Sequence, residues 1–205
     1  MIYRVSEDVY VFGGIKGLVR DGNELKKELM ETRPEIILIT ISPEQVEGMK
    51  DFIKDPFEID MSDYEIIYGI NLSQYGEVMT PSPVYIEATK YAMENEVEMF
   101  GLDMDEDTYQ NVYSRKVKTF DLLRHSLRKK KISRLKFNSE TAEEFVEKWN
   151  DTVDIKSFKK VNAERIATME SQLDKYLDEY SGKKIICISD YDYYKELVAY
   201  LKKDD

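Results

Sequence analysis

The sequence predicts an α/β protein with a mainly parallel sheet flanked by helices, and two observations carry this prediction. Short apolar runs rich in β-branched residues alternate along the chain with longer amphipathic stretches, the order typical of a parallel sheet covered by helices. Hydrophobic residues make up 42% of the chain and charged residues 35%, which is enough apolar material for a core beneath a charged surface. We expect a single α/β domain over residues 1–205, with a helical insertion at about 107–181 before the last strand.

Five apolar runs predict the strands. The first, at 9–12, ends at Gly13-Gly14, and the second, at 35–41, is nearly unbroken, as in a strand buried on both faces. A shorter run at 65–68 is the third candidate. The runs at 97–102 and 184–189 complete the set, and the fourth ends at Asp103.

Helix signals lie between these runs. A helix at 23–32 is expected to stop before Arg33-Pro34, because the residue before a proline disfavours helical geometry. Ser42-Pro43 and Ser82-Pro83 each place an N-cap serine before a proline, which predicts helices that begin at residues 43 and 83. Further helices are predicted at 107–131, from the capping signal at 139–143, at 160–180 and at 193–202.

The chain has one His and one Cys, and these counts exclude several classes of site. Zinc sites built from four Cys, from two Cys and two His, or from three His cannot form within one chain, nor can a disulfide. A nucleophilic relay would have to use His125, which lies in a basic helix where a packing role is expected. Cys187 lies inside an apolar strand, so we expect a core residue.

Membrane and secretion signals are missing from the sequence. No run approaches the roughly 18 apolar residues that span a bilayer, and the first residues lack the features of a signal peptide. We therefore expect a cytoplasmic protein without a membrane partner.

Basic residues are concentrated in one segment. Ten of the 30 basic residues, but one of the 41 acidic ones, lie between Arg115 and Lys136, so this segment carries +9 on a chain of net charge -11. Two interpretations remain open: a solvated helix face that pairs with acidic neighbours, or a docking element for an acidic partner. Nucleic acid is disfavoured, because the rest of the chain would repel phosphates. The docking residues would be Arg128, Lys129, Lys130 and Lys131.

Chemistry is expected beyond the carboxyl ends of the strands, where open α/β sheets bind their ligands. Gly13 to Gly17 lacks the spacing of a phosphate-binding loop, although Lys16 could bind an anion. Asp103, Asp105 and Asp190 could hold Mg²⁺ or Mn²⁺ for hydrolysis, with Asp192 nearby, since hard divalent cations prefer oxygen ligands. The same aspartates could instead cap helices.

The layout over most of the chain resembles the TraB/PrgY family, part of the wider EreA/ChaN-like group. Members begin with an apolar strand that ends in Gly-x-x-His, and the matching stretch here is Gly13-Gly14-Ile15-Lys16. An acidic end of the middle strand is similar to Leu102 to Asp105, and a family Arg stretch followed by Met is similar to Asn162 to Arg165 with Met169. The second Gly-x-x-His of the family falls at Ser189 to Asp192.

The departures from the family pattern concern its chemical groups. Lys16 and Asp192 stand at the two motif His positions, and Thr40 stands where the family has a strand-end Glu. The resemblance therefore implies a degenerate, non-catalytic member without a cofactor. Its ligand-binding residues would be Gly13, Lys16, Glu164, Arg165 and Asp192.

Three functions follow from these patterns. The favoured one is a TraB-like module, a pseudoenzyme, that binds an unidentified small molecule or protein. The others are a divalent-metal-dependent hydrolase and an adaptor that docks an acidic partner through the basic helix. A homodimer is expected because symmetric dimers are the commonest oligomers.

Overall fold

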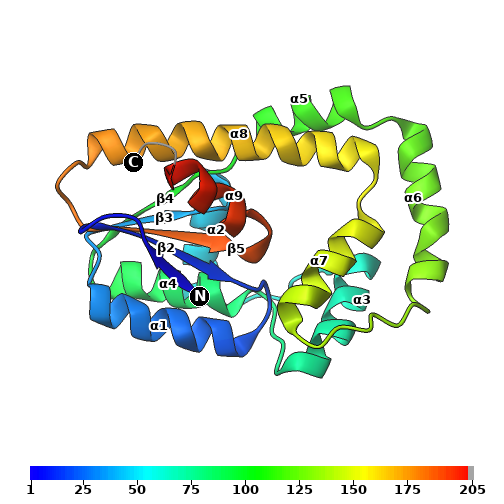
Figure 1. The fold of residues 1–205 in the computed structure, drawn as a ribbon, viewed down its shortest axis with the longest axis horizontal. Helices are drawn as coiled ribbons and strands as arrows, with labels where there is room; N and C mark the ends of the chain where they lie inside the picture. Colours follow the sequence, from blue (N-terminus) through cyan, green and yellow to red (C-terminus); the bar gives the residue numbers. More distant parts are fainter. Residues whose placement is uncertain (203–205) are drawn as a thin grey trace.

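The computed structural model, which describes residues 1–202, confirms an α/β fold with a mainly parallel sheet (Figure 1). The five strands lie in the order β1-β2-β5-β3-β4, and all neighbours are parallel except the β1–β2 pair. Their bounds are Ile2–Arg4 (β1), Val9–Gly14 (β2), Ile36–Ile39 (β3), Glu98–Gly101 (β4) and Ile185–Asp190 (β5).

Helices connect the strands, and α2 and α4 begin at the residues that the sequence predicts. Ser42 caps α2 with a capping box that includes Gln45, and Pro43 occupies the first helical position. The bounds are Val19–Thr32 (α1), Pro43–Lys54 (α2), Asp63–Leu72 (α3), Ser73–Tyr75 (η1), Pro83–Glu94 (α4), Glu106–Lys116 (α5), Thr119–Ile132 (α6), Ala142–Val153 (α7), Lys156–Glu179 (α8) and Tyr191–Leu201 (α9).

Three predicted elements need correction. The run at 65–68 is not a strand but part of α3, because Ser62 and Glu65 form a capping box that starts a helix there. The predicted helix at 107–131 is two helices, since the backbone is extended at Val117, whose side chain is buried, and at Lys118. The short strand β1 was missed, because three residues carry too little periodicity to be recognised.

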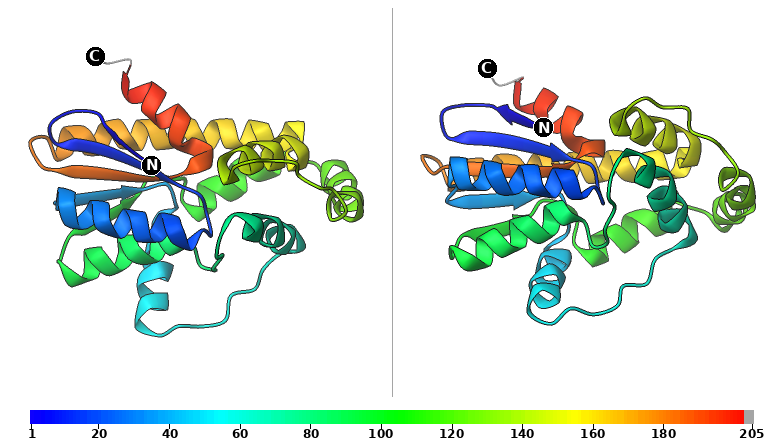
Figure 2. Two further views of the ribbon diagram at one scale, coloured as in Figure 1. Left: turned by 60° about the horizontal axis from the view of Figure 1, so that its bottom comes forward. Right: turned by 90° about the horizontal axis from the view of Figure 1, so that it is seen from below.

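Two layers of helices cover the sheet (Figure 2). Ile37 and Ile39 face α1, α2 and α4, whereas Ile36 and Leu38 face α8 and α9, as the two-residue period of a strand requires. Burial on both faces explains why the second apolar run of the sequence is nearly unbroken.

A third group of helices lies beyond the carboxyl ends of the strands. α3, α6 and α7 gather there at one end of the molecule (Figure 1), around an apolar cluster centred on Phe145 and Trp149. Ile15 and Tyr191, which directly follow β2 and β5, belong to the same cluster. This arrangement places helix α7 opposite the strand ends. No helix within residues 1–202 is long and apolar enough to cross a membrane.

Candidate functional site

A pocket of about 500 Å³ lies between the carboxyl ends of the strands and the helices α3 and α7. Lys16 follows β2, Ile41 follows β3 and Asp192 follows β5, and all three line the pocket. Its volume is within the range of sites that bind small molecules. The position is the one expected for an open parallel sheet.

Lys16 lies on a loop that is tied down on both sides. The buried Asp21 accepts a hydrogen bond from the Ile15 amide at 2.7 Å, and the Met79 amide donates to the Gly17 carbonyl at 2.9 Å. Gly17 has a φ of 99°, a conformation that favours glycine. The loop therefore presents the Lys16 side chain, which is exposed, from a fixed backbone.

Asp192 stands in the first turn of α9 and is held by α7. The Asn150 Nδ2 donates to the Asp192 Oδ1 at 2.8 Å, while the side chain remains open to solvent through the pocket. The protein around the carboxyl raises its pKa to about 6, mainly through loss of hydration and then through the charge of Asp190. The charge of Asp154 acts in the same direction, and the Asn150 hydrogen bond and Lys16 oppose it.

Asp190 ends β5 behind the pocket wall. Its amide donates to the Thr40 Oγ1 at 3.1 Å, which joins the ends of β5 and β3. Tyr85, a buried residue of the pocket wall, lies close enough to interact with the Asp190 carboxyl. Neither the Tyr85 hydroxyl nor the Asp190 Oδ1 has a hydrogen-bond partner of normal geometry within residues 1–202. Burial raises the pKa of Asp190, and the charges of Lys16 and Arg165 act against it.

Asp103 and Arg165 form a partly buried ion pair next to Asp190. The Arg165 Nε lies 2.9 Å from the Asp103 Oδ2, and the terminal guanidinium nitrogen binds the same oxygen. The Arg165 guanidinium also lies 5.3 Å from the centre of the Tyr193 ring, a distance at which the ring face attracts the cation. The pair joins the end of β4 to α8 across the sheet edge.

Aromatic side chains form much of the pocket wall. Tyr68 and Trp149 pack edge to face with ring centres 5.5 Å apart, and Phe52 and Phe57 do so at 5.4 Å. The six aromatic residues that line the pocket are Phe52, Phe57, Tyr64, Tyr68, Tyr85 and Trp149.

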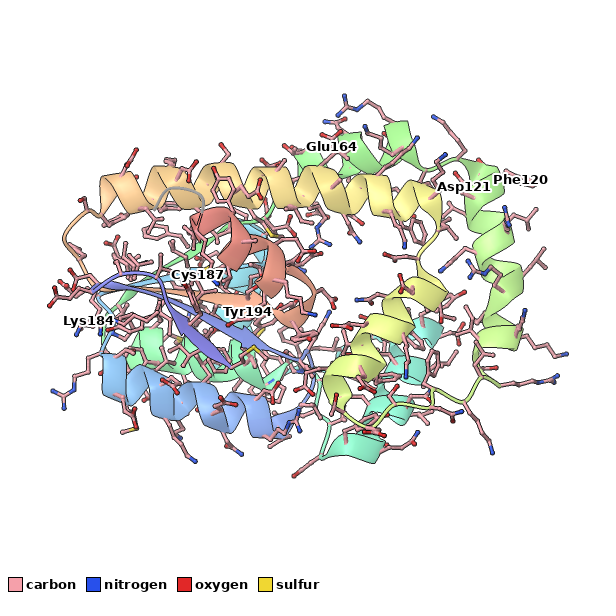
Figure 3. The ribbon with its side chains drawn as sticks, in the orientation of Figure 1. Phe120, Asp121, Glu164, Lys184, Cys187 and Tyr194 are labelled. Carbon is pink, nitrogen blue, oxygen red and sulfur yellow. The ribbon has the colours of Figure 1, made fainter. Side chains whose placement is uncertain are left out.

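The structure brings some of the predicted ligand-binding residues together and separates others. Lys16 and Asp192 line the pocket, whereas Arg165 is not among the lining residues and pairs with Asp103. Glu164 instead lies where α8 meets α5 (Figure 3) and pairs with Lys116 at 2.7 Å. Gly13 is covered by Tyr194, since a Cβ at Gly13 would lie 2.5 Å from the Tyr194 ring. Glu164 and Gly13 are therefore not among the residues that line the pocket.

The three predicted metal ligands do not meet at one point. The Asp103 carboxylate is already paired with Arg165. The exposed Asp105 caps α5, where its carboxylate accepts a hydrogen bond from the Thr108 amide at 2.7 Å. Asp190 is left at the end of β5. In the part of the chain that the structure describes, no group of three His, Cys, Asp or Glu side chains is arranged to hold a metal ion. The donors present do not fit an Mg²⁺ or Mn²⁺ site, because Arg165 already neutralises Asp103.

The predicted docking residues lie on α6 and differ in their contacts. Arg128 donates to the Thr152 carbonyl, and Lys129 pairs with Asp63, so both are engaged within the molecule. Lys130 and Lys131 are exposed.

Sequence reasoning missed the residues that shape the pocket. Tyr85, Asn150 and Trp149 lie on α4 and α7, far in sequence from the strand ends that pointed to the site. One signal was available: the chain has 15 Tyr, 8 Phe and 1 Trp, and six of these aromatic residues line the pocket.

The chain was also compared with known proteins. No protein-family model and no curated protein sequence matches it.

Proposed function

We propose that the protein binds a small molecule in the pocket beyond the strand ends and performs no catalysis there. The observation that carries this proposal is the pocket itself, about 500 Å³ in volume, with an aromatic wall and the charged residues Lys16 and Asp192. Sites of this kind, mostly apolar with a few polar groups, are typical of small-molecule binding.

The TraB-like resemblance supports the same proposal. Lys16 and Asp192 stand at the two motif His positions, and both line this pocket. Because a lysine and an aspartate replace the two motif histidines, the pocket lacks the metal-ligating imidazoles that the family motifs supply. It can still bind a ligand.

The binding test uses Trp149, the only tryptophan of the chain, which lies in the pocket wall. The probe is Nile red, a neutral apolar dye that tests the cavity without testing its charge. We expect saturable binding of one dye, with energy transfer from Trp149. The variant Gly48→Leu should weaken it, because Gly48 lines the pocket and a Cβ at this position would meet no atom within 4 Å, so the new side chain can extend into the cavity.

The matched control is Ala199→Leu, which adds the same side chain at an exposed position of α9. Dye binding that does not saturate, or that Gly48→Leu and Ala199→Leu change equally, would contradict the proposal.

The hydrolase alternative is tested separately, with the metal ions alone. We expect millimolar Mg²⁺ or Mn²⁺ to leave the melting temperature unchanged, because Arg165 neutralises Asp103. A rise in melting temperature that Asp190→Asn abolishes would favour the hydrolase instead.

A second candidate function, docking of an acidic protein partner, is favoured by the outer face of α6. Phe120, Leu123 and Leu127 are 71%, 57% and 74% exposed and lie on one side of the helix, given their spacing (Figure 3 labels Phe120). The exposed basic residues beside them are Arg124, Lys130 and Lys131. An acidic partner would match this charge and cover the apolar stripe.

Polyglutamate is the probe for this surface. We expect salt-sensitive binding that is lost when Arg124, Lys130 and Lys131 are replaced with Glu. The control reverses three exposed lysines elsewhere, Lys27, Lys156 and Lys160. Equal loss in both triple variants would remove α6 as the docking element.

A further inference from the structure

The charges at the pocket do not balance. Glu65 and Asp192 line it, and Asp190 lies directly behind Tyr85, whereas Lys16 is the only basic residue among the lining residues described. Arg165 contributes little free positive charge, because Asp103 holds it in an ion pair. The pocket lining therefore carries an excess of negative charge, which a bound cation would neutralise.

The aromatic wall suits an organic cation. A cation gains free energy when it lies within about 6 Å of the face of a Trp, Tyr or Phe ring, and the gain grows when water is excluded. Trp149, the ring type that binds cations best, lies on α7 beside Asn150, which holds Asp192. Trp149 and Asp192 both line the pocket, so a ligand that fills it can contact the ring and the carboxylate.

Two buried polar atoms beside the pocket, the Tyr85 hydroxyl and the Asp190 Oδ1, have no hydrogen-bond partner of normal geometry within residues 1–202. Tyr85 lines the pocket although the residue is only 6% exposed, and its buried hydroxyl lies close enough to the Asp190 carboxyl to interact with it. Buried polar atoms without partners cost folding free energy, so they point to a group that binds them. An ammonium group carries the donors that a phenol oxygen and a carboxylate oxygen can accept.

We infer that the ligand is an organic cation, a primary or methylated amine attached to an apolar body. The charged end would lie between Asp192 and the Tyr85 hydroxyl, and the apolar body would contact Trp149, Tyr68 and Phe52. This inference rests on the proposed binding function, because it names the chemistry of the molecule that the same pocket holds. An anionic ligand would place its charge against Asp192 and Asp190, with Lys16 alone to balance it.

The test uses three probes of one shape and different charge: 2-phenylethylamine, 2-phenylethanol and phenylacetate. Binding is measured at neutral pH by calorimetry and by the fluorescence of Trp149. We expect the amine to bind at least about 10-fold more tightly than the alcohol, and phenylacetate to bind most weakly.

Two variants should move this preference in opposite directions. Asp192→Asn should reduce the preference for the amine over the alcohol by about 10-fold, and Lys16→Met should increase it, since Lys16 repels a cation. The matched control is Glu196→Gln, an exposed acidic residue of the same helix as Asp192, which should leave the preference unchanged.

The outcomes separate the two proposals. Equal binding of the three probes, or tighter binding of phenylacetate, overturns the organic-cation inference and leaves the binding function standing. If none of the three probes binds and Nile red also fails to bind, both proposals are wrong. A preference for the amine that Asp192→Asn and Glu196→Gln reduce equally also overturns the inference, because general surface charge would then explain it.

Discussion

At the scale of single residues, Asp192 keeps a carboxylate where negative charge costs folding free energy. Its pKa is raised to about 6 by lost hydration and by Asp190, so the folded state holds its proton more tightly than the unfolded chain does. Above that pH the folded state carries a charge that its surroundings oppose. A group of this kind is typical of a functional site, where binding outweighs stability.

Replacing Asp192 with Asn should therefore stabilise the protein at neutral pH. The amide oxygen can accept the same hydrogen bond from Asn150, and the charge is gone. We expect a gain of about 1 kcal/mol in the free energy of unfolding, kept small because water in the open pocket screens the charge. The gain should shrink as the pH falls through 6, the folded pKa, toward about 4, the pKa of an unfolded Asp.

Urea unfolding of both proteins across this pH range measures the effect. Glu196→Gln, which removes a charge from an exposed residue of the same helix, is the control and should leave the stability nearly unchanged. A gain of the same size at every pH would mean that packing, not charge, is responsible.

The ion pair of Asp103 and Arg165 leads to a second prediction at this scale. Arg165→Met leaves the 7% exposed Asp103 without its partner, so we expect a loss of about 3 kcal/mol in the free energy of unfolding. The double variant with Asp103→Asn should recover at least about 1 kcal/mol of this loss, since no unpaired charge then remains.

Denaturant unfolding of the single and double variants tests the coupling. Lys116→Met is the comparison, because it removes the more exposed pair of Lys116 with Glu164 and should cost far less than Arg165→Met. If Arg165→Met costs no more than Lys116→Met, the buried pair is not what joins β4 to α8.

The position of a single residue could be predicted where it follows from the backbone topology, and not where it depends on the direction of a side chain. Lys16 and Asp192 could be expected to lie near each other because the ends of parallel strands meet at one edge, which is a property of the backbone. Glu164 was misplaced relative to the pocket because neighbouring residues of a helix point in different directions. Arg165 faces Asp103, while Glu164 turns outward to Lys116. Motif spacing alone does not contain that rotation.

At the scale of elements, the contact of α2 with β4 depends on one glycine. A Cβ at Gly101 would lie 2.6 Å from the Ile41 carbonyl oxygen and 2.8 Å from the Pro43 nitrogen, both backbone atoms. Backbone atoms cannot turn away as a side chain can. The end of β4 therefore approaches the start of α2 as closely as it does only because residue 101 has no side chain.

Gly101→Ala should lower the free energy of unfolding by about 2 kcal/mol, the typical effect of forcing a methyl group into a packed region. The comparison is Gly48→Ala within α2, where an added Cβ meets no atom within 4 Å. That change should raise stability by about 0.5 kcal/mol, because alanine favours a helix. Thermal unfolding of both variants checks the prediction, and equal effects would contradict it.

Elements were predictable where a local signal agreed with the long-range packing. Ser42-Pro43 begins α2 as expected, because a cap is a contact between neighbours in sequence. The run at 65–68 was misassigned because three consecutive apolar residues fit a strand and a helix equally well. The capping box of Ser62 and Glu65 was the signal that would have decided between them.

At the scale of the whole molecule, the sheet pairs a strand near the start of the chain, β2, with the last strand, β5. β5 is the last strand in sequence, yet it lies between β2 and β3 and pairs with both. The helices α5 to α8 precede β5 in sequence, so the centre of the sheet is filled only by a segment that follows these helices. This central position could not be read from the apolar runs, because they show which residues are buried but not which strands are neighbours.

Such a topology predicts that the helices beyond the strand ends and the sheet unfold together as one domain, which the structure describes over residues 1–202. Two single reporters lie in the two parts: Trp149 on α7 and the buried Cys187 in the middle of β5. Burial raises the pKa of the Cys187 thiol to about 12, so it should react with a thiol reagent only when the sheet opens. We expect Trp149 fluorescence and Cys187 labelling to change at the same urea concentration. If the fluorescence changed at lower urea while Cys187 stayed protected, the helices around the pocket would be a separate folding unit, and the single-domain prediction would be wrong.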